Sequence, residues 1–176
     1  MQVIAVARRL VLPDWAVGAG FVRNLVWDHL HDRAVPTPLN DVDVLYFDAG
    51  DTGRAAEARA ERALRAALPD CPWSVRNQAR MHLGNGDRPY RDTGDAMTHW
   101  LETATAIAVR QEPDGRLGLL APFGTADLFA LRIVPTPAGR RRPDALETRL
   151  RAKDWPRTWP RLVTEIRRDA GSSPRR

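Results

Sequence analysis

The chain has little cysteine and no long apolar run, and each absence excludes a class of protein. Its 176 residues include one cysteine, Cys71, which excludes an internal disulfide and a cysteine-based metal cluster. No apolar stretch approaches the ~20 residues of a membrane-spanning helix. The start of the chain has no positive charge before its apolar residues, and Arg8 and Arg9 interrupt it, so we expect no signal peptide. We therefore expect a cytoplasmic protein without membrane contact.

What the chain does contain is a globular composition with an excess of arginine. Hydrophobic residues make up 43% and charged residues 28%, and the length suits one domain with its own core. The net charge is +5, and much of the excess falls after residue 139. A basic balance favours anionic partners such as nucleic acid or nucleotide phosphate. An arginine-rich solvated surface would give the same balance.

The hydrophobic pattern predicts helices and strands that alternate along the chain. We expect a main domain over 1–138 and a basic extension over 139–176 that packs on it, with its last residues disordered. The pattern predicts helices over 1–11, 21–31, 54–68, 96–105 (capped by Asp95) and 144–152, and strands over 15–19, 41–47, 73–82 and, as a hairpin, 106–121.

One of these strands begins with an unexpected pair of charges. The run D-V-D-V-L-Y-F, residues 41–47, is mostly β-branched, aromatic and aliphatic, yet it opens with Asp41 and Asp43. Side chains two positions apart on a strand point to the same face, so two like charges would stand together. A divalent cation between the carboxylates would offset their repulsion. Without a metal ion, one carboxylate should have a raised pKa.

A glycine turn before this strand completes a unit suited to a nucleoside triphosphate. Gly18, Ala19 and Gly20 join a short strand to a helix that carries Arg23. Glycine lets the backbone approach a ligand closely, and the start of a helix offers unpaired N–H groups and a positive dipole end. Arg23 can clamp a phosphate oxygen. Mg²⁺ or Mn²⁺ held by the two aspartates would contact the same phosphates.

Three other interpretations of this region stay open. The turn fits part of the dinucleotide-binding pattern G-x-G-x-x-G, but Arg23 occupies the third glycine position, where close packing is needed. F-D-A-G-D-T-G could carry a phosphatase-like aspartyl nucleophile, but Gly50 stands where a second carboxylate is required. In a structural interpretation, Asp41 caps a turn and Asp43 pairs with an arginine.

The turn and the acidic strand together resemble the signature of a known enzyme group. G-A-G-F-V-R-N-L-V-W-D followed by D-V-D-V is similar to G-G-x-V-R-D-x-L-L … D-x-D, the head-domain signature of CCA-adding tRNA nucleotidyltransferases and bacterial poly(A) polymerases. More closely, the chain resembles small bacterial nucleotidyltransferase family proteins, which share L-N-D-V-D-V-x-Y-F-D, W-S-V-R-N-Q-A-R-M-H, E-T-A-T, A-P-F-G and D-L-F. The resemblance implies the polymerase-β-like α/β (α+β) fold, a mixed and mostly antiparallel sheet flanked by helices.

The resemblance also implies roles for individual residues, with two departures. Asn24 replaces an aspartate of the signature, and the strand 73–82 lacks a third carboxylate; Asn77 or Gln78 stands there instead. Asp127 and then Glu102 are the remaining acidic candidates, although either could be a cap or a surface pair. The candidate set is Asp41, Asp43 and Asp127 for catalysis, Asp41 and Asp43 as metal ligands, and Gly18, Ala19, Gly20, Arg23, Asn24, Arg76, Asn77 and Arg80 for nucleotide binding.

Further candidates for contact with phosphate or RNA come from the basic and aromatic residues. Arg76 and Arg80 fall on one face of the expected strand 73–82, where they could meet phosphate or RNA, or pair with nearby acids. Trp155 and Trp159 lie among arginines, which suits either nucleic acid or a packed C-terminal turn.

The sequence thus predicts a metal-dependent nucleotidyltransferase that moves a nucleotidyl group from a nucleoside triphosphate to a hydroxyl of RNA, protein or a small molecule. A head domain alone makes complete CCA addition unexpected. The alternative is a nucleotide- or RNA-binding module of the same fold that has lost catalysis, and a toxin-like partner protein is a third possibility. The base, the acceptor and the oligomeric state are not indicated.

Overall fold

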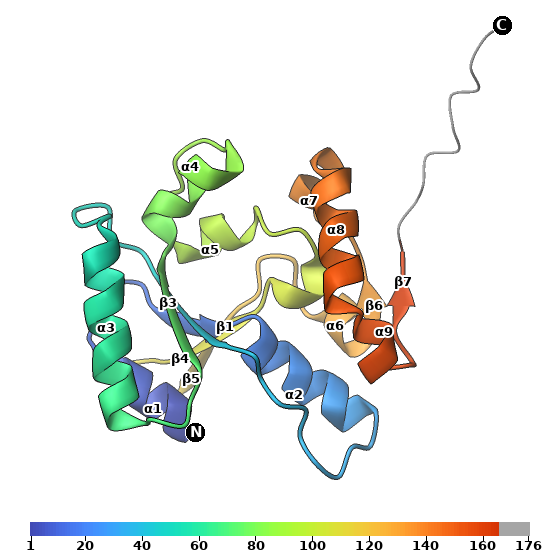
Figure 1. Cartoon of the computed structure of the whole chain (residues 1–176), viewed down its shortest axis with the longest axis horizontal. Coiled ribbons are helices and arrows are strands. Elements are labelled where there is room, and N and C mark those ends of the chain that lie inside the picture. The colour runs from blue at the N-terminus through green and yellow to red at the C-terminus, as the bar shows by residue number, and fades with distance from the viewer. Residues whose placement is uncertain (166–176) are drawn as a thin grey trace, which may run out of the picture.

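A five-stranded sheet forms the centre of the molecule (Figure 1). The computed structural model describes residues 1–165. Strands β2 and β3 run parallel, and the other neighbouring strands run antiparallel. The mixed, mostly antiparallel sheet implied by the resemblance is therefore confirmed. The strands are β1 (Ala16–Gly18), β2 (Val42–Tyr46), β3 (Trp73–Asn77), β4 (Ala108–Gln111) and β5 (Leu117–Leu120), in the order β3-β2-β1-β4-β5.

Helix α3 (Arg54–Ala67) joins the two parallel strands, as a parallel pair requires. Its alanine- and arginine-rich sequence is strongly helix-forming, and it buries Ala60 and Leu64 against the sheet. Helix α1 (Gln2–Arg8) packs beside it. Together they cover a core of strand side chains: Val17, Val42, Val44, Tyr46, Trp73 and Val75.

A second core lies between α2 (Gly20–Leu30) and the C-terminal helices α8 (Pro143–Lys153) and α9 (Trp155–Thr158). Trp27 is fully buried, and its ring meets the rings of Trp155 and Trp159 edge-on at 5.5 and 5.1 Å. The Trp159 indole N–H donates to the carboxylate of Asp28 at 2.8 Å. Both C-terminal tryptophans therefore serve packing, one of the two roles that the sequence left open.

The remaining elements are short and connect the two cores. None of the helices within residues 1–165 combines the length and apolar character that a bilayer crossing requires. The boundary at 138/139 stays a prediction, and the disorder expected at the end of the chain lies outside the described residues. The short remaining elements are η1 (Gln78–Arg80), α4 (Met81–Asn85), α5 (Thr93–Met97), η2 (Thr103–Thr105), α6 (Ala126–Phe129), α7 (Pro137–Arg141), and a two-stranded sheet of β6 (Arg132–Ile133) and β7 (Val163–Thr164).

Two element boundaries expected from the sequence are wrong, and in both cases a side-chain cap is the reason. The strand expected over 73–82 ends at Asn77, because the Asn77 side chain accepts from the N–H of Ala79 and starts the 3-10 turn η1. The helix expected over 96–105 is found as α5, which begins at Thr93 and ends at Met97. Asp92 caps it by accepting from the N–H of Asp95 at 2.6 Å, whereas Asp95 itself pairs with arginines.

Helix α7 docks directly on the backbone of the segment before η2. The hydroxyl of Thr136 donates to the carbonyl of Trp100 and accepts from the N–H of Gly139 at 3.0 Å, which caps the helix. Gly139 is buried so closely against this segment that a Cβ there would overlap the carbonyl oxygen of Leu101. Only glycine fits at this position.

We expect Gly139→Ala to lower the free energy of unfolding by about 1–3 kcal/mol, because the added methyl must push α7 away from Leu101. Urea denaturation followed by far-UV circular dichroism measures the change. Gly84→Ala is the matched control, since a Cβ at Gly84 meets only open space within a short helix. Equal stability of wild type and Gly139→Ala would contradict the tight docking.

Candidate functional site

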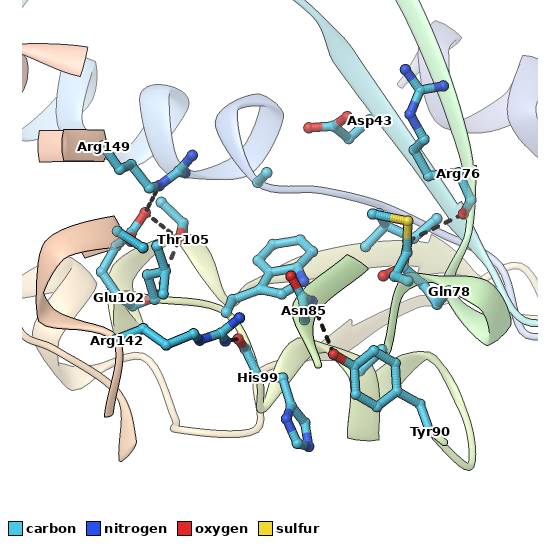
Figure 2. Close-up of a pocket in the computed structure, with 17 residues that line it drawn as sticks. Asp43, Arg76, Gln78, Asn85, Tyr90, His99, Glu102, Thr105, Arg142 and Arg149 are labelled. Atoms are coloured by element: carbon cyan, nitrogen blue, oxygen red, sulfur yellow. Dashed lines mark hydrogen bonds and ion pairs between the residues drawn. The ribbon is translucent and has the colours of Figure 1, made fainter. Parts of the chain in front are cut away.

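A cavity of about 370 Å³ lies between the sheet, the α4–α5 region and helix α8. Figure 2 shows Asp43 between Arg149 on one side and Arg76 on the other, with Tyr90 and His99 at the opposite end. Segments distant in the sequence thus meet around one hollow. Its polar and charged lining residues are Asp43, Arg76, Gln78, Asn85, Tyr90, His99, Glu102, Thr105, Arg142 and Arg149.

The strand register places Asp43 beside Gly18, a residue without a side chain. On β2, Asp43 is paired with Gly18 of β1 and with Ser74 of β3. A Cβ on Gly18 would lie 3.0 Å from the Cβ of Ala108 and 3.1 Å from the carbonyl oxygen of Ile107. These contacts are tighter than most side chains make, so a Cβ there would require its neighbours to shift by a few tenths of an ångström. The candidate turn and the candidate metal ligand are therefore neighbours in the sheet.

Asp43 carries a charge that the protein does not neutralise. Burial raises its pKa above the ordinary value of 3.8, and the nearby charge of Asp41 raises it further. A hydrogen bond from Ser74 and the more distant charges of Arg76 and Lys153 act in the opposite direction. Neither aspartate has an ion-pair partner within 4.0 Å among the described residues. The pairing of Asp43 with an arginine, one of the open interpretations, is not found.

The aspartate pair is suited to a hard divalent cation but does not enclose one. Within residues 1–165, no group of three or more His, Cys, Asp or Glu side chains is arranged to hold a metal ion. Mg²⁺ in phosphate-transfer sites typically uses one or two carboxylates and completes its shell with substrate oxygens and water. Two uncompensated carboxylates fit this kind of site, in which the substrate supplies the other ligands.

The turn between β1 and α2 is strained at its centre. Ala19 has φ 51° and ψ −121°, in the left-handed region that an L-residue with a Cβ rarely adopts. Its N–H is held by the carbonyl of Ile107 at 2.9 Å, and it precedes the first residue of α2 without capping it through a side chain. The first N–H groups of α2 are therefore left available to an anion.

Arg23 is a buried cation without a carboxylate partner. Its side chain is 6% exposed, it lies 4.5 Å from the ring centre of Trp155, and it donates to the amide oxygen of Asn24 at 2.8 Å. Its Nε has no partner. Burial and then the charge of Arg149 lower its pKa to about 10, although the charges of Glu102, Asp41 and Asp43 act in the other direction. A guanidinium of this kind is suited to an anionic ligand.

Arg149 and Glu102 form a pair that the sequence did not predict. The Arg149 Nε donates to the Glu102 carboxylate at 2.7 Å, and the Thr105 hydroxyl donates to the same oxygen at 2.9 Å. Glu102 is fully buried and its other oxygen has no partner. Glu102 stood second among the acidic candidates, whereas nothing in the sequence distinguished Arg149 from the other C-terminal arginines.

Of the eight predicted nucleotide-binding residues, only Ala19 and Arg76 line the cavity; Arg23 does not, nor does the predicted metal ligand Asp41, and Asn77 and Arg80 are held by other contacts. The carboxylate of Glu57 binds Arg80 at 2.7 and 2.8 Å, the paired state that was the open alternative. Asn77 is fully buried and holds a loop, because its amide donates to the carbonyls of Asp48 and Asp51. These contacts are structural, and a nucleotide-binding role for either residue stays a prediction without support from its position.

Of the remaining predicted residues, Arg76 reaches the cavity and Asp127 does not line it. The Arg76 guanidinium is half-exposed and donates to the carbonyl of Val75. Asp127, on α6, accepts from the Thr103 hydroxyl at 2.8 Å and lies 3.4 Å from Arg132. The proposed third catalytic carboxylate therefore stays a prediction.

The end of the cavity opposite Asp43 carries a hydrogen-bonded cluster that the sequence analysis missed. The Tyr90 hydroxyl donates to the Asp87 carboxylate at 2.7 Å, and His99 Nδ1 lies 3.0 Å from that carboxylate. Burial, together with Asp87, raises the pKa of Tyr90 to about 12, although a hydrogen bond from Asn85 opposes the shift. The local sequence here offers only Pro89 followed by Tyr90, a dipeptide that does not by itself indicate a site.

Known proteins with similar sequences and structures bear on this site. A profile of the nucleotidyltransferase family matches residues 5–164. A structure solved by NMR and described as a CCA-adding enzyme head domain is 30% identical, with a TM-score of 0.81 over 93% of this chain and 87% of that one. No curated protein matches by sequence.

Two larger enzymes share the fold at low identity. A CCA-adding enzyme in complex with CTP is 14% identical, with a TM-score of 0.59 over 94% of this chain and 39% of that chain. A tRNA-processing enzyme is 16% identical, with a TM-score of 0.57 over 94% and 45%. This chain thus spans less than half the length of either enzyme.

The raised pKa of Asp43 predicts that removing its charge stabilises the fold. The folded state holds a proton on Asp43 more tightly than the unfolded chain does, so ionisation of Asp43 costs stability as the pH rises through its folded pKa. In metal-free buffer at neutral pH, we expect Asp43→Asn to melt a few degrees higher than wild type.

Differential scanning calorimetry at several pH values checks this, and the gain should shrink as the pH falls through the folded pKa of Asp43 toward 3.8, the ordinary pKa of the group, and be lost below it. Asp70→Asn, an exposed position, is the control and should change little. A lower melting temperature for Asp43→Asn at neutral pH would contradict the uncompensated charge.

Proposed function

The chain belongs to the nucleotidyltransferase family, and from this premise we propose that it transfers a nucleotidyl group from a nucleoside triphosphate to a hydroxyl acceptor with the help of Mg²⁺ or Mn²⁺. One observation carries the proposal. Two carboxylates without a cation lie near a buried guanidinium without a carboxylate, close enough for their charges to interact. A metal-bound triphosphate supplies both missing charges, because the metal ion meets Asp41 and Asp43 while the phosphates meet Arg23.

In this proposal each protein group has a defined task. The N–H groups at the start of α2 and the Arg23 guanidinium hold the triphosphate, and the bare backbone at Gly18 lets it approach β2. When bound by Asp41 and Asp43, the metal ion would neutralise phosphate charge and lower the pKa of the acceptor hydroxyl. The acceptor oxygen forms a bond to the α-phosphorus, and the bond to the leaving pyrophosphate breaks. Trp27 and Trp155 pack against the buried guanidinium of Arg23. Because these rings exclude water, they strengthen the electrostatic attraction between Arg23 and a phosphate.

A second candidate function is nucleotide binding without transfer. The observation that favours it is the position of the remaining acids, since Asp127 does not line the cavity and the Glu102 carboxylate is already bound by Arg149. A site with two carboxylates alone would bind the metal-bound triphosphate but activate the acceptor weakly. The same experiment separates the two candidates.

The test incubates the protein with α-labelled nucleoside triphosphates, Mg²⁺ or Mn²⁺, and total RNA or protein as acceptor. CTP and ATP come first, because CCA-adding enzymes of similar fold have been solved with each. We expect label transfer by wild type and a loss of about 100-fold or more in Asp43→Asn, which lacks a ligand for the metal ion. Scintillation counting of acid-precipitated acceptor measures the transfer.

Three further variants sharpen this test. Arg23→Met should weaken triphosphate binding in equilibrium dialysis while the protein stays folded. Asp70→Asn, at an exposed position that does not line the cavity, should behave as wild type. Asp127→Asn decides whether that carboxylate takes part in transfer. The proposal fails if the triphosphate binds wild type and Asp43→Asn equally well and no acceptor is ever labelled, an outcome that would favour the binding module.

A further inference from the structure

A second hollow of about 420 Å³ lies along the outer side of α3, at the edge of the sheet formed by β3. All but one of its lining residues are charged. We call this hollow the α3 groove. Its charged lining residues are Arg54, Glu57, Glu61, Arg62, Arg65 and Arg76.

The charges of the α3 groove do not cancel. Glu57 is held by Arg80, which lies outside the groove, and Glu61 is held by Arg65 at 2.7 Å. Arg54 and Arg62 are exposed and have no hydrogen-bond or ion-pair partner among the described residues. Two cations are therefore free to bind an anion.

Arg76 connects the α3 groove to the cavity that contains Asp43, because it lines both hollows. It stands on β3, where it neighbours Leu45 of β2, two residues beyond Asp43. Its side chain is 45% exposed, and the nearest carboxylate, that of Glu61, is 3.9 Å away. A long ligand could therefore lie in the groove with one end beside Asp43.

We propose that the α3 groove binds the phosphate backbone of a single-stranded nucleic acid, whose terminal hydroxyl is the acceptor for the nucleotidyl group. The inference rests on the proposed function and names its acceptor class. Arg54 and Arg62 are eight residues apart on one helix, a rise of about 12 Å. This span suits phosphates about two nucleotides apart on an extended strand, with Arg76 next to its reacting end.

The groove predicts the manner of binding as well as the partner. Its lining has no aromatic residue on which a base could stack, so it contacts phosphates and positions the strand without reading its sequence. Binding should therefore depend on salt and tolerate changes of base. A folded duplex, with its two strands and larger diameter, should fit the narrow hollow less well.

The test measures fluorescence anisotropy of labelled single-stranded RNA and DNA oligonucleotides of mixed sequence, with the full chain, over a series of salt concentrations and without nucleotide. We expect Arg54→Gln/Arg62→Gln to bind at least about tenfold more weakly than wild type, and the slope of log K against log salt to fall by about 1.4. Binding of RNA, DNA or both supports the proposal.

The matched control is Arg140→Gln/Arg157→Gln, which removes the same charge from exposed positions on α7 and α9, on the opposite side of the molecule from α3 (Figure 1). It should bind oligonucleotides within twofold of wild type. An equal loss in both double variants would overturn the proposal, since binding would then follow net charge. Tighter binding of an acidic peptide or of duplex RNA than of the single strand would also overturn it.

Label transfer separates this proposal from the one on which it rests. If the groove variant binds oligonucleotide normally while wild type labels a protein or small molecule, the groove proposal fails and nucleotidyl transfer stands. If the groove variant loses oligonucleotide binding but no acceptor is ever labelled, the groove stands as a binding surface and nucleotidyl transfer fails.

Discussion

The pairing of β1 with β2 is the constraint on which the rest of the site depends. Because Gly18 faces Asp43 in the register, the strand that bears the carboxylate and the turn that leads into α2 cannot move independently. Ile107 and Ala108, at the start of the adjoining strand, crowd the space that a Cβ at Gly18 would occupy. The sheet thus holds a negative group, a bare backbone and a helix start in one arrangement before any ligand arrives, which lowers the cost of binding.

The C-terminal segment is part of this site because of its tryptophans. Trp155 and Trp159 pack edge-on against Trp27, and the Trp155 ring lies within 5.5 Å of both Arg23 and Arg149. Two guanidiniums are thereby held close together, that of Arg23 buried and that of Arg149 partly exposed, and Glu102, which is bound to Arg149, is the carboxylate whose charge acts most strongly on Arg23. Two guanidiniums so close together repel each other, so this packing favours an anion beside them, which the proposed triphosphate would supply.

Elements that depend on neighbouring residues were predicted correctly from the sequence, whereas features that depend on contacts between distant residues were missed. The alanine-rich helix α3 and the apolar strand β2 depend on neighbouring residues, and the sequence predicted both. The end of β3 was missed because the amide of Asn77 competes with the strand for backbone hydrogen bonds. Arg149 could not be distinguished, since its importance comes from Glu102, 47 positions away in the chain. For the site, the sequence predicted the aspartate pair and Arg23 but not the opposite wall of the cavity.

One strained residue and two uncompensated charges occur together in the β1–α2–β2 unit, although positive φ angles are also found at Val11, Asp14, Asp32, Leu131 and Asp154. Ala19 has an unfavourable backbone, Asp43 a raised pKa, and Arg23 a lowered one, all within one strand-turn-helix unit. Other buried charged residues within 1–165 are paired, as Glu57 with Arg80 and Asp95 with two arginines show. Selection for stability alone would remove such costs. Under the proposed function, a ligand that carries both a cation and phosphates would relieve the charge imbalance on both sides at once.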